Sequence, residues 1–302
     1  QENRRYRELA RMGAELKQIG GLIDSTNVEA DVAILMGYEG RWAMEAGLDL
    51  KPMQAHLDAA RFHEALLRRS LPVDALDPHC NLSRYRLVIA PRLWLVDDRI
   101  ADNLRSFVER GGVLCLTAAS GVVDEYNKSF NEPRPGPLAG MAGIEVSDLS
   151  PLHKPFAISS QSMKDLEGAH AQDMADEIHP TSAEVLAVYA EGWRKGLPVL
   201  TRNRWGQGWV YYLGSVLEGH ALGALVDALL AQAGINKGLE TPEGVFAYER
   251  RSPNIRLMFL LNHNEHPAYV TLPDGWKDVF TEQTCSEVEI EPVGVRILKA
   301  AV

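Results

Sequence analysis

Two side chains able to act as nucleophiles, Cys115 and Ser120, stand close together in the middle of the chain. A catalytic cysteine or serine needs a neighbouring base and a tight strand-to-helix turn that exposes it. Cys115 lies inside the apolar run Val-Leu-Cys-Leu-Thr, without the glycines of such a turn. The histidine that would activate it is expected after a later strand, but the strand that ends at Tyr212–Ser215 has no His-Pro-Glu sequence. Ser120 stands in Ala-Ala-Ser-Gly-Val, which departs from G-x-S-x-G, and an acidic segment follows. Both patterns favour structural roles.

The adjacent carboxylates Asp124 and Glu125 form a second chemical pattern, because paired acids perform general acid–base catalysis. Side chains of adjacent residues usually point apart, so we interpret this turn as the exit of a loop from the sheet and as a subunit contact. The three cysteines form no C-x-x-C and the histidines no H-x-x-x-H, so the sequence predicts no metal site. Gly206–Gly208 predicts a hairpin turn, since no helix follows it as a phosphate loop requires. No cofactor is predicted.

An aromatic and charged loop is predicted at Gly37–Leu48, directly after the first strand. In open α/β sheets ligands bind at this end of the strands, and aromatic plus carboxylate side chains suit contact with a sugar. Exposed tryptophan and arginine are also enriched in the cores of protein interfaces. We therefore predict packing against another domain or subunit, with sugar contact as the alternative. The side chains concerned are Tyr38, Glu39, Arg41, Trp42 and Glu45.

The elements that would position these residues alternate between strands and helices. This alternation predicts βαβ units and a parallel sheet. Residues 121–181, rich in proline and glycine, are too long for a simple connection, so we interpret them as an excursion from the sheet that serves as an interface. The predicted strands are Asp31–Met36, Leu71–Val73, Arg86–Ala90, Val113–Thr117, Val185–Ala190, Leu197–Thr201 and Trp209–Gly214, with helices near Met53–Arg69, over Ile100–Val108 and through Leu222–Leu230.

The two ends of the chain differ from this α/β part. Arg4–Ile23 predicts a helix whose apolar stripe needs a partner surface, and short strands separated by turn signals follow Gly238. We therefore divide the chain into residues 1–24, a helix left from a preceding domain; residues 25–240, an α/β domain; and residues 241–302, a small antiparallel all-β domain.

Charge and composition exclude several classes of function. A formal net charge of −10 argues against nucleic acid as a partner, because phosphate binding needs a basic face. No run approaches eighteen apolar residues, so no membrane span is predicted. Three scattered cysteines favour a reducing compartment. The chain does not begin with methionine, so any N-terminal signal would lie outside it.

The order of these segments resembles the C-terminal part of the β-galactosidases of glycoside hydrolase family 42. The resemblance covers nearly the whole chain, and its specificity lies in the ordered set rather than in one motif. It is carried by YRELARMGAELKQIGGLIDSTNVEADVAILMGYEGRWAMEA, YRLVIAPRLWLVDDRIADNLRSFVERGGVLCLTAASGVVDEYNK, PGPLAGMAGIEVSDL, GQGWVYYLGS and FLLNHNEHPAYVTLP.

The resemblance implies an enzyme with an N-terminal (β/α)8 barrel, a flavodoxin-like trimerisation domain that is also similar to class I glutamine amidotransferases, and a small β domain. In that family the barrel holds both catalytic glutamates. A barrel takes about 250 residues, which this chain has no room for, so no residue inherits a catalytic role. The chain then resembles the assembly region of a bacterial cytoplasmic β-galactosidase, whose partners are its own copies, as a homotrimer, and the barrel.

Two other functions stay open at this point. One is an amidotransferase-like or esterase-like hydrolase that uses Cys115 or Ser120. The other is a carbohydrate-binding module that contacts a sugar through Trp42, Trp94 or Trp276.

Overall fold

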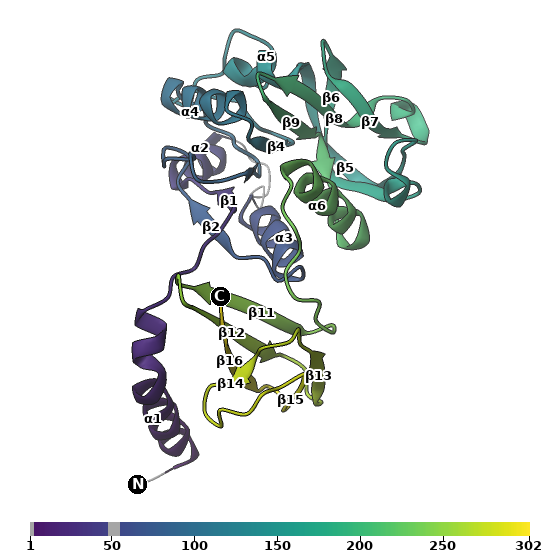
Figure 1. Ribbon diagram of the computed structural model, residues 1–302. Coiled ribbons are helices and arrows are strands. Elements are labelled where there is room, and N and C mark those ends of the chain that lie inside the picture. Colours follow the sequence, from purple (N-terminus) through teal and green to yellow (C-terminus); the bar gives the residue numbers. More distant parts are fainter. Residues whose placement is uncertain (1–2, 48–54) are drawn as a thin grey trace. The chain divides into compact units, whose positions relative to one another are not determined.

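The computed structural model describes residues 3–47 and 55–302, which form two compact units (Figure 1). The larger unit comprises residues 31–66 and 73–236. The smaller unit comprises the segment up to residue 30, residues 67–72 and residues 237–302. No helix in the described part of the chain is long and apolar enough to cross a membrane.

A mixed ten-stranded sheet forms the centre of the larger unit. Its strands are β1 (Val32–Leu35), β2 (Val73–Leu76), β3 (Leu87–Ala90), β4 (Val113–Thr117), β5 (Ile144–Ser159), β6 (His170–Pro180), β7 (Glu184–Tyr189), β8 (Pro198–Trp205), β9 (Gly208–Leu213) and β10 (Ser215–Val216). They lie in the order β10-β6-β5-β7-β8-β9-β4-β3-β1-β2. The half β2-β1-β3-β4-β9 is parallel. Every residue of β1, β3 and β4 is buried, as expected for parallel strands covered on both faces.

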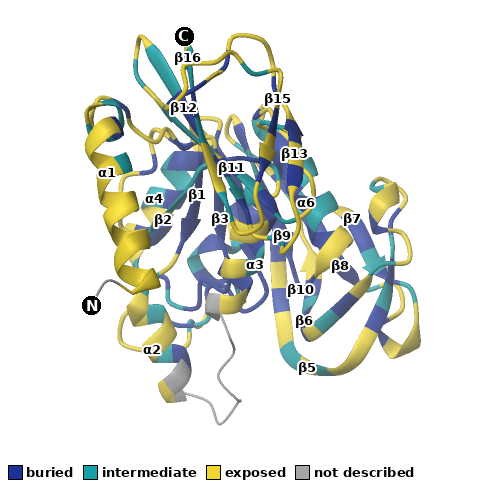
Figure 2. Cartoon of the chain, turned by 90° about the horizontal axis from the view of Figure 1, so that it is seen from below, coloured by how far each residue is buried: buried dark blue, intermediate teal, exposed yellow. Residues whose placement is uncertain are grey.

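Some helices of the larger unit connect parallel strands, two of them between β1 and β2 and one between β3 and β4, and the others precede β5 or follow β10. The helices are α2 (Tyr38–Gly47), α3 (Ala55–Leu67), α4 (Asp98–Glu109), α5 (Ala139–Ala142) and α6 (Gly219–Ala233), with short 3₁₀ turns η1 (Gly136–Leu138), η2 (Lys164–Leu166) and η3 (Gly192–Arg194). Asp97 caps the N-terminus of α4, because its carboxylate accepts a hydrogen bond from the Ile100 N–H at 2.7 Å. The apolar stripe of α4 buries Ile100, Leu104 and Phe107. In Figure 2 the strands β1 and β3 are dark blue, whereas β5 and the outer faces of helices are largely yellow, so the buried centre of the sheet lies in its parallel half.

The predicted parallel sheet is correct for only half of the strands. β7 and β8 are antiparallel, and only β9 of the three later strands joins the parallel set. The reason is the length of the connections: the turn of Gly206 and Gln207 joins β8 to β9 as a hairpin, and a parallel crossover needs a dozen residues or more.

The predicted excursion at residues 121–181 is also corrected, because its second half forms β5 and β6 of the same sheet. Two irregularities in the register, at Val146/Leu149 and Leu152/Phe156, interrupt the pairing of these strands. Each such bulge shifts the alternation of inward and outward side chains. The sequence therefore lacked the period-two pattern by which strands are recognised.

Smaller differences concern element boundaries. The strand predicted at Leu71–Val73 begins two residues later, as β2. The helix predicted from Met53 is described from Ala55 onward. Met53 itself and the end of the predicted loop at Leu48 lie outside the described residues.

The smaller unit contains the helix α1 (Arg4–Asp24) and two small antiparallel sheets. The strands β11 (Val245–Arg251), β12 (Ile255–Asn262), β16 (Val295–Ala301) and β14 (Lys277–Asp278) form one sheet in that order, and β13 (Ala268–Thr271) pairs with β15 (Glu287–Ile290). Along β12, Met258 and Leu260 face the core of the β sheets. Leu257 faces the other way and packs with Ile19 of α1. The last turns of α1 therefore belong to the packing of this unit.

Candidate functional site

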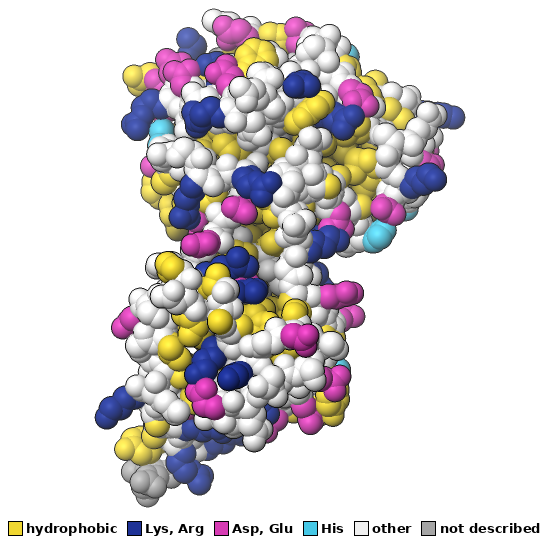
Figure 3. All heavy atoms as spheres, viewed as in Figure 1, with side chains coloured by type: hydrophobic (Ala, Val, Ile, Leu, Met, Phe, Trp, Pro, Cys, Tyr) yellow, Lys and Arg dark blue, Asp and Glu magenta, His cyan; other side chains and the backbone are white. Residues whose placement is uncertain are grey.

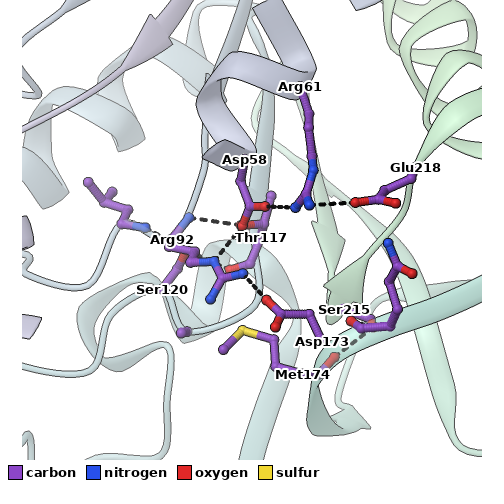
Figure 4. Close-up of polar contacts among 12 residues, drawn as sticks. Asp58, Arg61, Arg92, Thr117, Ser120, Asp173, Met174, Ser215 and Glu218 are labelled. Carbon is purple, nitrogen blue, oxygen red and sulfur yellow. Dashed lines mark hydrogen bonds and ion pairs between the residues drawn. The ribbon is translucent and has the colours of Figure 1, made fainter. Parts of the chain in front are cut away.

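A chain of ion pairs, buried at its centre and exposed at its ends, crosses the C-terminal edge of the larger unit's sheet (Figure 4). Arg92, two residues after the end of β3, forms ion pairs with Asp58 of α3 and, at 2.5 Å, with Asp173 of β6. Asp58 also accepts from Arg61 at 2.8 Å, and Arg61 pairs in turn with Glu218. The side chain of Arg92 is 1% exposed and that of Asp58 is 7% exposed. The network thus ties the parallel half of the sheet to the antiparallel half.

The backbone around Arg92 has the form of a tight strand-to-loop turn. Arg92 has φ +44°, a left-handed conformation that is unfavourable for a residue with a branched or long side chain. Its N–H donates to Thr117 Oγ1 at 2.8 Å, and the next N–H, of Leu93, donates to Ser120 Oγ at 3.2 Å. Ser120 Oγ itself donates to the Thr117 carbonyl at 2.7 Å. Ser120, whose sequence pattern favoured a structural role over that of a nucleophile, is a buried link between two loops.

A cavity of about 460 Å³ lies beside this turn, at the C-terminal ends of β1, β2 and β3. β1 lies between β2 and β3, so the chain changes direction across the sheet here, and such switch points are where open α/β sheets bind ligands. The lining is mostly apolar with a few polar groups. It includes Tyr38, Glu39, Arg41, Asp77, His79, Arg92 and Trp94.

His79 forms a bridge at the mouth of the cavity. Its Nδ1 lies 2.8 Å from Asp77 Oδ1 and its Nε2 lies 2.8 Å from Oδ2 of Asp97, the residue that begins α4. The hydrogen bond with Asp97 raises the pKa of His79, against the opposing effect of burial. Burial tends to raise the pKa of Asp97, but the hydrogen bonds from His79 and the Ile100 N–H lower it overall.

We expect His79→Gln to destabilise the protein more at about pH 5.5 than at about pH 9. A raised pKa in the folded state means that the bridge contributes fully below the ordinary histidine pKa and loses its contribution as the pH rises through the folded-state pKa. Because His79 is one third exposed, the difference should stay below about 1 kcal/mol. Urea unfolding at the two pH values measures it, and equal losses at both would contradict the charged bridge.

Asp176 is a buried carboxylate on β6. Its Oδ2 accepts from Tyr212 Oη at 2.6 Å and from the Ala119 N–H at 3.1 Å, whereas its Oδ1 has no partner among the described residues. Burial raises the pKa of Asp176 to about 6, although these two hydrogen bonds lower it. Burial and the charge of Asp176 raise the pKa of Tyr212 well above its ordinary value.

The carboxyl of Asp176 should make the free energy of unfolding fall as the pH rises from about 4 to about 7. We expect Asp176→Asn to remove this fall. A carboxyl whose folded-state pKa is raised favours folding below its ordinary pKa, and this contribution disappears as the pH rises through about 6. The difference in the free energy of unfolding between the variant and the unchanged protein should shift by on the order of 2 kcal/mol over this pH range. Thermal or urea unfolding against pH measures it, and parallel pH profiles would contradict the raised pKa.

The predicted interface or sugar-contacting residues lie on a helix rather than in a loop. Residues 38–47 form α2, which contains good helix formers and no proline. Tyr38 and Trp42, 69% and 60% exposed, are one helical turn apart, and their ring centroids are 5.8 Å from each other. Tyr38, Glu39 and Arg41 line the cavity, whereas Trp42 does not. The side chain of Glu45 lies outside the described residues.

The turn at Ser120–Glu125 is held by its own backbone contacts. Gly121 has φ +63°, and a Cβ there would lie 2.1 Å from the Pro135 carbonyl oxygen, so only glycine fits. Asp124 Oδ1 accepts from the N–H groups of Tyr126 and Lys128, both at 2.9 Å, which closes the turn. Glu125 is exposed. Neither Asp124 nor Glu125 lines the cavity, although the turn that contains them contacts α2: Val123 shares a core cluster with Met44, and Asn127 Nδ2 donates to the Ala43 carbonyl at 3.5 Å.

The thiol of Cys115 is fully buried in β4, and burial raises its pKa to about 12. A thiol with such a pKa is protonated at neutral pH and unreactive. No group of three or more His, Cys, Asp or Glu side chains within residues 3–47 and 55–302 has the arrangement of a metal site.

Known proteins match the chain along almost its entire length. The sequence profile of the β-galactosidase trimerisation domain matches residues 30–236, and that of the β-galactosidase C-terminal domain matches residues 247–300. The chain belongs to the β-galactosidases of glycoside hydrolase family 42. It comprises the trimerisation and C-terminal domains of that family.

Individual relatives agree with this assignment. A β-galactosidase of Geobacillus sp. (strain Y412MC61) is 33% identical over 306 residues, which cover 99% of this chain and 45% of the relative. The crystal structure of a β-galactosidase from Bacillus circulans sp. alkalophilus is 31% identical with a TM-score of 0.95, over 99% of this chain and 46% of that one. A family 42 β-galactosidase from G. stearothermophilus is 27% identical with a TM-score of 0.93, over 100% and 44%. The chain therefore spans less than half the length of these relatives.

Several residues of the trimerisation domain's site were missed by sequence reasoning. Arg92 follows the predicted strand Arg86–Ala90 by two residues, and His79 follows β2 by three, so both stand at strand ends where ligand sites form. That position was the available signal. Their partners Asp58, Asp97 and Asp173 carry no local signal, because they lie in other elements.

Proposed function

We propose that the chain is the assembly region of a β-galactosidase that hydrolyses terminal β-D-galactosides in carbohydrate metabolism, and that it does not itself contain the catalytic centre. The observation that carries this proposal is the match of two named non-barrel domains to residues 30–236 and 247–300. Retaining glycosidases need two carboxyl groups about 5–5.5 Å apart, and in barrel enzymes these stand at the ends of barrel strands. The matched domains occupy the residues that a barrel would need.

In this proposal the physical role of the chain is to associate with its own copies as a homotrimer. The parallel strands in the order β2-β1-β3-β4-β9 support describing the larger unit as flavodoxin-like, with a likeness to class I glutamine amidotransferases. In this proposal residues 1–24 are a helix left from the preceding domain, residues 25–240 are the α/β domain, and residues 241–302 are the small β domain. A homotrimer of such units would hold the catalytic barrels around a shared centre and limit which galactosides reach them.

The barrel is the second partner, and the exposed apolar stripe of α1 between Tyr6 and Leu16 is the surface that we assign to it. Its apolar side chains Tyr6, Leu9, Met12 and Leu16 are about half exposed or more, whereas Ile19 further along α1 is buried. A solvent-exposed apolar stripe on a helix is typical of a contact with another domain. The relatives are more than twice as long as this chain, which leaves room for such a domain.

The exposed stripe gives a test on the chain alone. The double substitution of Leu9→Gln and Met12→Gln should change the free energy of unfolding by less than about 0.5 kcal/mol, because both side chains already face solvent. Ile19→Ala should cost about 2–4 kcal/mol, because it opens a cavity against Leu257. Similar losses for both changes would mean that the stripe is already covered, and would sink this assignment.

A hydrolase assay tests the absence of a catalytic centre. The purified chain should release no nitrophenol from a chromogenic β-galactoside, and no activity on amide or ester substrates should depend on Cys115 or Ser120. The burial of both side chains supports this expectation, and Ser120 also carries a structural hydrogen bond. Galactoside turnover that persists through purification from a host lacking β-galactosidase would overturn the proposal.

The setting that we propose is the cytoplasm of a bacterium. The relatives come from bacteria, and the three described cysteines are unpaired thiols, which suits a reducing compartment. Charged side chains of both signs are interspersed on the visible face in Figure 3, without a broad basic field. This surface and the net charge of −10 support the expectation that nucleic acid is not a partner.

A further inference from the structure

Two residues that line the cavity at the ends of β1, β2 and β3 carry hydrogen-bond donors that the described part of the chain does not use. Arg92 and Trp94 both line it, and each has a buried N–H without an acceptor within residues 3–47 and 55–302: Nη1 of Arg92 and Nε1 of Trp94. A buried donor with no acceptor is unfavourable, so nearly all such groups in folded proteins find a partner. These two groups favour a ligand with acceptor oxygens.

The mouth of the same cavity offers acceptors. Asp77 uses Oδ1 for both the N–H and the Nδ1 of His79, at 2.9 and 2.8 Å, so its Oδ2 is left for a donor. Glu39 adds an exposed carboxylate at the start of α2. Hydroxyl groups both donate and accept hydrogen bonds. A molecule with several hydroxyl groups therefore meets the need of the buried donors and of the carboxylates at once.

The charges around the cavity favour a neutral ligand. Arg92 is already neutralised by its ion pairs with Asp58 and Asp173. Of the remaining lining residues, Glu39 and Asp77 are acidic and Arg41 is basic, with His79 held between two carboxylates. A phosphate group would meet these carboxylates at close range and be repelled.

We propose that this cavity binds a neutral monosaccharide or disaccharide. Its volume of about 460 Å³ lies within the range of small-molecule sites, and its mostly apolar walls suit the C–H face of a sugar ring. The exposed ring of Tyr38 at the mouth offers a surface on which such a ring can stack. The choice of galactose as the probe rests on the proposed function, because galactose would be the product of the parent enzyme.

Titration calorimetry of the whole 302-residue chain with galactose tests the proposal. We expect saturable binding with one site per chain, weakened about tenfold by Asp77→Asn, which replaces a charged acceptor for the sugar hydroxyl by a neutral amide. Tyr38→Ala should also weaken binding without unfolding the chain, because Tyr38 is largely exposed. The matched control is Tyr126→Ala, an exposed tyrosine outside the cavity, which should leave binding unchanged.

Three results would overturn the proposal: no saturable heat with galactose, glucose or lactose; sugar binding that is unchanged in both Asp77→Asn and Tyr38→Ala; or binding of inorganic phosphate but not of galactose. Light scattering on the same samples separates this inference from the proposed function. A trimer that binds no sugar contradicts the cavity's assignment only, and a monomer that binds galactose contradicts the assembly role only.

Discussion

Asp58→Ala is expected to destabilise the larger unit by about 3–5 kcal/mol, because it leaves the Arg92 guanidinium buried without its most enclosed counter-ion. The remaining partner, Asp173, has a side chain that is 56% exposed, so solvent screens its attraction to Arg92. Arg92 also holds a strained backbone turn after β3, so its displacement disturbs the hydrogen bonds to Thr117 and Ser120 as well. Urea unfolding followed by circular dichroism measures the loss.

The same network supplies the control. Glu218→Ala removes an exposed partner of Arg61 and should cost no more than about 1 kcal/mol. Replacing Asp58 and Arg92 together by apolar residues of similar size should recover much of the loss, because a buried ion pair costs its own desolvation. A loss below about 1 kcal/mol in Asp58→Ala would contradict the buried pair.

Trp276→Ala is expected to destabilise the smaller unit by about 3–5 kcal/mol. The indole is 1% exposed and stands in the core that joins β12, β16 and the β13–β15 pair. The Arg256 guanidinium lies 5.1 Å from the ring centroid, which adds a cation–π contact. The residue is therefore a structural anchor, and a role in carbohydrate binding would need an exposed ring.

Tyr269→Ala is the matched change in the same unit, because this aromatic side chain is 55% exposed on β13. It should alter the free energy of unfolding by less than about 0.5 kcal/mol. If the two units unfold in separate transitions, each loss of stability can be assigned to the unit whose transition shifts. If Trp276→Ala lowered the transition of the larger unit instead, the packing described for the smaller unit would be wrong.

The sequence predicted the parallel half of the large sheet well because its signals are local. β1, β3 and β4 are short continuous apolar runs, and Gly111 and Gly112 end the helix between β3 and β4 as expected. Such strands are buried on both faces, so their composition identifies them without any knowledge of their neighbours. The family resemblance rested partly on these segments and partly on residues of α1, β5 and the small β domain.

Local sequence signals did not predict the antiparallel half of the sheet or the ion pairs of Arg92. β5 and β6 are interrupted by bulges, which break the alternation that identifies strands. The ion pair between Arg92 and Asp58 joins residues 34 positions apart, and that with Asp173 joins residues 81 positions apart. Only the folded sheet brings these charges together. The helical form of residues 38–47 was missed because their aromatic and charged content was interpreted as functional rather than as helix-forming.

Multi-angle light scattering on the purified chain is the most direct check on an assembly role. Self-association through the trimerisation domain predicts a particle of three times the 33.4 kDa chain mass that persists on dilution into the low micromolar range. A single species of 33.4 kDa at every concentration would show that these two domains do not assemble on their own, and the central claim would then be contradicted.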